Sequence, residues 1–239
     1  MSDEQGLDRV RRAVYRPVGR ANALENTVSR IVQTIRIGVV APGEALPPER
    51  SLAELYGVSR DTVREAIREL ADTGWLVPRR GRYGGTFVAD PPPRPETPAS
   101  VDPTELDDTL GMRQLLEPGA ARAAALRTMT ADERDALWQR HTAASDASLD
   151  QYRRLDSLLH LAIAEAAGIP SLVPLVADSR ARVNTWLDAF PLLPRAIEHS
   201  QEQHERIVSA ILAGRADEAD AAMRDHLAAS EALMRGFLS

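Results

Sequence analysis

The chain has 239 residues, of which 44% are hydrophobic and 27% charged, and its formal net charge is −6. This length and composition allow one large or two ordinary globular domains, each with a substantial core. The sequence contains no cysteine, which excludes disulfides and thiolate metal sites. No apolar run reaches the roughly 18 residues of a membrane span, and the N-terminus lacks a secretory apolar segment. We therefore expect a cytoplasmic protein with no membrane partner.

Charge is distributed unevenly along the chain. Residues 1–90 hold 14 arginines against 12 acidic residues, and residues 91–239 hold 15 against 23. A mildly basic front and an acidic back indicate two modules with different partners. Between them, DPPPRPETPASVDP, residues 90–103, contains six prolines and shows no helical or strand period. This segment is predicted to be a linker.

The front module is expected to consist of an N-terminal arm, residues 1–21, and a compact domain, residues 22–89. Apolar residues at helical spacing, with a glycine at each end point, predict three helices, over 21–38, 48–57 and 59–74. Two short β-type runs, WLV and TFV, then flank a tip rich in glycine and arginine. This order of three helices and a two-stranded wing is typical of a winged helix-turn-helix domain.

The third predicted helix carries polar and basic side chains on its solvent face. Helix-turn-helix proteins insert the N-terminal turn of this helix into the major groove, where an arginine fork suits guanine. Taken alone, two arginines four residues apart could equally form a solvated helix face with acidic partners. The turn, an N-cap at Ser59 and the wing arginines Arg79, Arg80 and Arg82 together favour DNA binding.

The stretch PGEALPPERSLAELYGVSRDTVREAIRELADTGWLVPRRGRYGGTFV resembles the DNA-binding domain of the GntR family of bacterial transcription regulators. The resemblance covers residues 22–89 without a gap and implies binding to double-stranded DNA. Asp61 carries a charge that disfavours a phosphate contact, so we expect it to cap the helix or to shape base preference. The family's DNA contacts fall on the LPPER arginine, the start of the recognition helix and the wing tip, which are Arg50, Ser59, Arg60, Thr62, Arg64, Arg80 and Gly81.

Helical patterns continue through the back module, and strand signals are absent from it. They predict one helix or a helix pair near Gly111, followed by helices over residues 131–147, 150–167, 171–189, 195–213 and 216–237. The simplest fold for residues 104–239 is an all-α antiparallel bundle. The chain as a whole is predicted to be mainly α, with its only sheet in the wing.

Three helices of the back module turn polar side chains toward apolar faces. Asp156 and His160 lie four residues apart in YRRLDSLLHLAIAEAAGIP, and His204 and His226 lie on apolar faces of two later helices. Because an unpaired buried charge is costly, Asp156 and His160 alone indicate an ion pair, a catalytic pair or a ligand pair. Three inward histidines and one aspartate favour a divalent transition metal such as Zn, Mn or Ni.

Three further stretches, MRQLLEPGAARAAA, LDSLLHLAIAEAAG and QHERIVSAILAGRADEADAAMRDHL, resemble the ligand-binding FCD domain of the FadR subfamily. The resemblance implies a small organic acid as effector, often coordinated to the metal. Arg113 could hold its carboxylate through two parallel hydrogen bonds, and an ion pair with Glu117 is an equally good alternative. In metal-binding members the ligands fall on Asp156, His160, His204 and His226.

The leading hypothesis is a homodimeric transcription regulator that binds a palindromic operator and is controlled by a small carboxylate. We expect it to be a repressor. The alternatives are a regulator that senses the metal itself, a metal-dependent enzyme, and a bundle in which the metal is only structural. An enzyme is disfavoured because the sequence offers no convincing general base beside the ligands.

Overall fold

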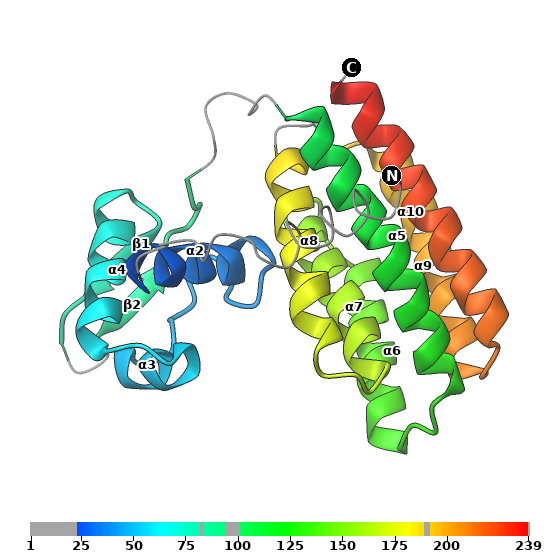
Figure 1. Ribbon diagram of the computed structural model, residues 1–239, viewed down its shortest axis with the longest axis horizontal. Helices are drawn as coiled ribbons and strands as arrows, with labels where there is room; N and C mark the ends of the chain where they lie inside the picture. Colours follow the sequence, from blue (N-terminus) through cyan, green and yellow to red (C-terminus); the bar gives the residue numbers. More distant parts are fainter. Residues whose placement is uncertain (1–22, 82–83, 94–100, 189–191, 239) are drawn as a thin grey trace, which may run out of the picture.

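The computed structural model describes residues 23–81, 84–93, 101–188 and 192–238. Figure 1 shows a small N-terminal unit beside a larger bundle of long helices. This mainly helical architecture with a two-stranded antiparallel sheet confirms the predicted fold class. The expected N-terminal arm and Arg82 lie outside the described residues, and the predicted domain boundaries stay predictions.

The N-terminal unit contains three helices and a wing. The elements are α2 (Ala23–Arg36), α3 (Glu49–Tyr56), α4 (Arg60–Asp72), β1 (Leu76–Arg79) and β2 (Gly85–Val88). Apolar side chains from all five elements form one core, in which Ile31, Val63 and Leu76 are buried. The predicted helices and wing strands are therefore present, with ends that differ by one or two residues.

The turn between α3 and α4 has the local chemistry that the sequence predicts. Gly57 adopts a left-handed conformation, with φ of 66°, immediately after α3. The hydroxyl of Ser59 accepts a hydrogen bond of 3.0 Å from the backbone N–H of Thr62, which caps α4. Asp61 does not take this capping role, because its carboxylate pairs with Arg64 at 3.1 Å.

The C-terminal bundle consists of six helices in the described part of the chain. They are α5 (Pro103–Leu126), α6 (Ala131–Ser145), α7 (Tyr152–Ala166), α8 (Leu172–Leu187), α9 (Pro194–Leu212) and α10 (Ala216–Leu238). Helix α5 packs against α7, α8, α9 and α10, so it forms the central element of the bundle. No helix in the described ranges is both long and apolar enough to cross a membrane.

Helix α5 is continuous, and the possible break at Gly111 does not occur. It also continues through Pro118, which has no N–H to donate to the carbonyl of Gln114. The guanidinium of Arg224 on α10 donates to this carbonyl at 3.3 Å. Buried alanines, including Ala120, Ala121 and Ala124, then let neighbouring helices approach closely.

Candidate metal site and nucleic-acid interface

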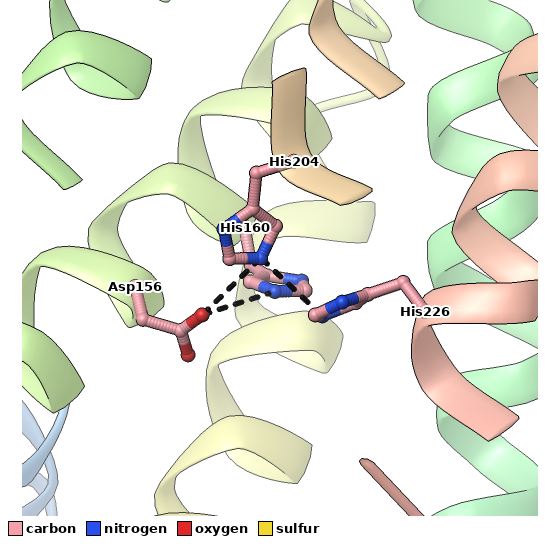
Figure 2. Close-up of side chains that lie close together, drawn as sticks. All are labelled: Asp156, His160, His204 and His226. Atoms are coloured by element: carbon pink, nitrogen blue, oxygen red, sulfur yellow. Dashed lines mark hydrogen bonds and ion pairs between the residues drawn. The ribbon is translucent and has the colours of Figure 1, made fainter. Parts of the chain in front are cut away.

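Four side chains from three helices meet in the bundle interior. Asp156 and His160 project from α7, His204 from α9 and His226 from α10 (Figure 2). One possible ligand atom from each lies within 4.8 Å of all the others. The Nε2 atom of His204 is 3.3 Å from Asp156 Oδ1 and 3.3 Å from His226 Nε2. The convergence that the sequence could only suggest is therefore present.

Local geometry and burial explain this arrangement. The four-residue spacing on α7 places Asp156 and His160 on one helix face, and His160 Nε2 lies 3.7 Å from Asp156 Oδ1. All four residues are buried, with exposed fractions of 7% or less. Burial to this degree strengthens the interactions between charges and makes any unpaired polar atom costly.

Neighbouring side chains orient two of the three imidazole rings. His160 Nδ1 bonds to the carboxylate of Glu117 on α5, and His226 Nδ1 donates to Gln203 Oε1 at 3.1 Å. Each bond occupies Nδ1 and leaves the Nε2 lone pair facing the centre of the group. His160 Nε2 has no hydrogen-bond partner among the described residues. This buried, unpaired acceptor, the ring orientations and the nitrogen-rich donor set fit a divalent transition metal.

The charges around the group favour the protonation states that a metal requires. Burial raises the pKa of Asp156, but Arg180 on α8, with His160 and His204, outweighs this and holds it well below its usual range. Burial lowers the pKa of His204 to about 3, and it lowers that of His226 well below the ordinary value. The site therefore offers an ionised carboxylate at Asp156 and neutral imidazoles at His204 and His226 at neutral pH.

Arg113 forms an ion pair with Glu117, which is one of the two environments that the sequence predicts for it. Its Nε donates to Glu117 Oε1 at 2.6 Å, and both side chains are almost completely buried. The pKa of Glu117 is lowered below its usual range, because Arg113 and His160 outweigh the effect of burial. Arg113 Nη2 has no hydrogen-bond partner in the described part of the chain. An effector contact of Arg113 stays a prediction.

A pocket of about 320 Å³ opens beside the group of four. Its polar wall includes Asp156, Arg180, Gln203 and His226, so it shares side chains with the candidate metal site. Its other wall is mostly apolar and includes Leu187, Leu193, Ile197 and Leu233. The combination suits a small ligand with one anionic end and a short apolar part.

Several residues that build the site were not assigned these roles from the sequence. The sequence indicates Glu117 only as a partner for Arg113, and it gives no signal for the contact of Gln203 with His226. Arg180 on α8 pairs with Asp156 across the bundle. Sequence spacing alone could not show which helices face one another.

Replacing Gln203 with leucine is expected to weaken metal binding about tenfold, because His226 loses the partner that orients its ring. Calorimetric titration of the chelator-treated protein with Zn²⁺ measures this change. Gln201 provides a matched control on α9, since its amide binds the carbonyl of Ser145 at 2.8 Å. A Gln203→Leu variant that binds as tightly as Gln201→Leu would contradict the assigned orientation.

Without metal, folding stability is expected to fall as the pH drops below about 6.5, the usual pKa of histidine. His204 and His226 resist protonation in the folded state, so the unfolded chain takes up more protons. From about pH 7.5 to about pH 5.5 the loss is about 2 to 3 kcal/mol for the two residues together. The lowered pKa values of Asp156 and Glu117 act in the same direction at more acidic pH.

Urea denaturation in the presence of a chelator measures this dependence. A His204→Gln/His226→Gln variant serves as the control and should show a smaller change with pH. An unchanged free energy of unfolding for the wild-type protein over this interval would contradict the burial of two neutral imidazoles.

The predicted DNA contacts lie at three places on the N-terminal unit. Most are exposed, while Thr62 is half-buried beneath the Ser59 hydroxyl. Arg50 pairs with Glu54 at 3.0 Å, and Arg64 pairs with Asp61. Exposed ion pairs of this kind contribute little, so a phosphate or base can replace the acidic partner. The exposed members at the start of α4 and at the wing are Ser59, Arg60, Arg64, Arg80 and Gly81.

Comparison with known proteins identifies both modules. Residues 24–88 match the family described as bacterial regulatory proteins, gntR family, and residues 108–229 match the FCD domain. The HTH-type transcriptional regulator LutR of Bacillus subtilis (strain 168) is 32% identical, over 85% of this chain and 97% of its own. The Glc operon transcriptional activator of Escherichia coli (strain K12) is 32% identical, over 85% of each chain.

The Uxu operon transcriptional regulator of Escherichia coli (strain K12) is 33% identical, over 78% of this chain and 76% of its own. Among solved structures, E. coli McbR/YncC covers 91% of this chain and 99% of that chain, with a TM-score of 0.55. At 19% identity that likeness supports the fold alone. The chain belongs to the GntR family and carries an FCD domain; it is a DNA-binding transcription regulator and not an enzyme.

Proposed function

We propose that a small organic acid, bound beside a divalent metal in the FCD domain, controls the operator affinity of this regulator. The observation that carries the proposal is the buried Asp/His₃ group with a pocket at its side. Asp156, His160, His204 and His226 would hold the metal, which would offer a coordination position to a carboxylate. Arg180 lines the same pocket and would attract an anionic ligand toward the metal.

We also propose that the regulator binds a palindromic operator as a homodimer. It would belong to the FadR subfamily and act in the cytoplasm. Two recognition helices would enter successive major grooves through Ser59, Arg60, Thr62 and Arg64. Arg50, Arg80 and Gly81 would contact the DNA backbone on either side. The relatives are named as operon regulators, which supports an operator as the target.

Repression is the expected effect on transcription, although the Glc relative is named as an activator. A promoter reporter that carries the selected operator measures the sign. Expression should rise when the regulator is removed, whereas a fall on removal would show an activator.

The operator and the effector can be found in one experiment. Selection from random DNA duplexes yields a binding site, and a mobility-shift assay then measures affinity with Zn²⁺, Mn²⁺ or Ni²⁺ and a panel of short carboxylic acids. We expect one acid to change the affinity only when metal is present. No selected duplex, or an acid effect that persists in chelator, would overturn the proposal.

Metal sensing is a second candidate, because four protein ligands would be enough to complete the coordination of a tetrahedral zinc ion. Manganese or nickel in an octahedral site would instead leave positions open for a carboxylate. Titration with each metal in the absence of acid separates the candidates. If metal alone produces the full change in DNA affinity, the sensor proposal replaces the effector proposal.

A further inference from the structure

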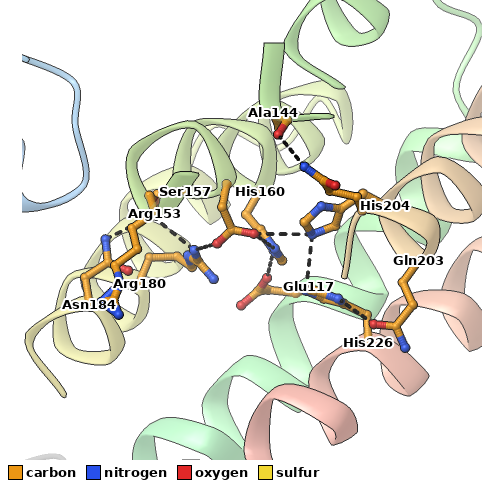
Figure 3. A network of polar contacts seen from close by, with 12 residues as sticks. Glu117, Ala144, Arg153, Ser157, His160, Arg180, Asn184, Gln203, His204 and His226 are labelled. Carbon is orange, nitrogen blue, oxygen red and sulfur yellow. Dashed lines mark hydrogen bonds and ion pairs between the residues drawn. The ribbon is translucent and has the colours of Figure 1, made fainter. Parts of the chain in front are cut away.

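A continuous series of buried hydrogen bonds leads from the candidate metal site to the DNA-binding domain. It begins at Asp156, whose Oδ2 pairs with Arg180 Nη2. Figure 3 shows Arg180 with Ser157 and Asn184, the next two residues of the series. The same Nη2 donates to Ser157 Oγ at 3.0 Å, and Asn184 Nδ2 donates to that oxygen at 2.9 Å. Asn184 Nδ2 also donates to the backbone carbonyl of Arg36 at 2.9 Å. The series therefore crosses from α8 to α2.

The two donor nitrogens and the hydroxyl that form this series use all of their hydrogens. Arg180 Nη2 has two hydrogens, directed to Asp156 and Ser157, and Asn184 Nδ2 has two, directed to Ser157 and Arg36. The Ser157 hydroxyl accepts twice and donates to the carbonyl of Arg153 at 2.9 Å. The first four side chains, those of Asp156, Ser157, Arg180 and Asn184, are buried. A shift of one group must therefore break a bond made by the next.

The contact at α2 has a clear structural role. Arg36 is the last residue of α2, so its carbonyl is one of the groups that a helix end leaves without an intrahelical partner. The Asn184 amide satisfies this carbonyl from the opposite domain. Because a carbonyl only accepts, the contact also fixes which atom of the Asn184 amide faces α2. The Asn184 Oδ1 has no hydrogen-bond partner in the described ranges, so Nδ2 alone holds the amide.

Other contacts fix the position of this junction. Arg36 Nη1 donates to Thr185 Oγ1 at 2.6 Å, and its guanidinium lies over the Trp75 ring at 5.5 Å. Arg154 on α7 donates to the carbonyl of Gly38 at 3.1 Å. Helix α2 therefore ends against α8 and α7, while α2 itself packs on the recognition helix α4 (Figure 1).

We infer that Asn184 couples occupancy of the metal site to the position of α2 and thus to the DNA-reading helix. A cation at Asp156 Oδ1 competes with Arg180 for the same carboxylate. Arg180 then moves relative to Ser157, which weakens the hydrogen bond from Asn184 to the Arg36 carbonyl at the end of α2. This bond re-forms when the cation leaves. The two states, with this bond made and with it lost, supply the switch that such coupling requires. This inference rests on the proposed control of DNA binding through the metal site.

An Asn184→Leu variant tests the inference, because leucine has a similar shape and cannot donate to Arg36 or Ser157. The protein is stripped with chelator. Hydrogen exchange at the amides of residues 33–38 is measured as Zn²⁺ alone is added, and affinity for the selected duplex is measured as Zn²⁺ and the active acid are added together. We expect Zn²⁺ to change the exchange in the wild type but not in Asn184→Leu, and we expect the duplex affinity to change about fivefold or more in the wild type and less than about twofold in the variant. Zn²⁺ should still bind to the variant, because Asn184 is not one of the four candidate ligands.

An Asp178→Ala variant is the matched control, since Asp178 on α8 contacts Gln33 of α2 but is not part of the series. It should retain the Zn²⁺ response. If Asn184→Leu does not fold, Ser157→Ala replaces it, because this variant lacks the hydroxyl that links Arg180 to Asn184. A full Zn²⁺ response in Asn184→Leu, or no Zn²⁺-dependent exchange at residues 33–38 in the wild type, would overturn the inference. Failure of the wild type to select any duplex would instead overturn the proposed function, and the exchange measurement would still decide the inference.

Discussion

Replacing His204 with alanine is expected to lower the affinity for Zn²⁺ by at least about 100-fold. His204 Nε2 lies 3.3 Å from both Asp156 Oδ1 and His226 Nε2, so its loss removes the nitrogen between two other ligands. The wild-type protein should gain about 4 kcal/mol of stability at a Zn²⁺ concentration 1,000 times its dissociation constant, and the variant should gain about 1.4 kcal/mol or less at the same concentration. Competition with a coloured chelator and urea denaturation with and without Zn²⁺ measure the two effects.

His199→Ala is the control for this prediction, because His199 lies on the same helix but is exposed. It should bind Zn²⁺ as the wild type does. If His204→Ala retained wild-type affinity, the four side chains would not act together as the metal site. Circular dichroism of both variants excludes unfolding as the cause of any loss.

The double substitution Arg60→Ala and Arg64→Ala is expected to weaken specific DNA binding by at least about 30-fold. Both residues lie in the first turns of α4, and the Arg60 side chain makes no hydrogen bond or ion pair with the described residues. Its guanidinium is therefore available to a base or a phosphate without breaking an internal contact. Fluorescence anisotropy with the selected duplex at fixed salt measures the loss, since salt alone changes such affinities strongly.

A control with the same loss of charge is Arg140→Ala and Arg206→Ala, at exposed positions of α6 and α9. This variant should bind the duplex almost as tightly as the wild type. Equal weakening by both double substitutions would mean that binding depends on overall charge and not on the recognition helix.

The sequence predicted those parts of the site that depend on position within one helix. Asp156 and His160 share a face because they are four residues apart, and His204 and His226 each lie on an apolar face. The N-cap at Ser59 was predictable for the same reason, since capping depends only on nearby residues. Such local rules need no knowledge of the partner helix.

The parts that the sequence did not predict depend on which helices face one another. Glu117 orients His160 only because α5 passes beside α7, and its role is invisible in the spacing of α5 alone. The path of α5 through Pro118 is stabilised by Arg224, which comes from α10. The contact of Asn184 with Arg36 depends on how the two domains pack together. These features require the tertiary arrangement.

The arrangement of the site also explains why its polar groups can be buried together. Asp156 is balanced by Arg180, and Glu117 is balanced by Arg113, so each carboxylate has a cationic partner. The imidazoles of His204 and His226 remain neutral, and all three histidines offer a nitrogen atom to one centre. A divalent cation placed there would find acceptors already oriented, which lowers the cost of organising the site on binding.

The central claim is that this metal site controls DNA affinity, and its most direct test is one titration. The affinity of the stripped protein for the selected duplex is measured as metal and the active acid are added, for the wild type and for His204→Ala in parallel. The account predicts a change of about fivefold or more in the wild type and none in the variant. An identical response of the two proteins would contradict it.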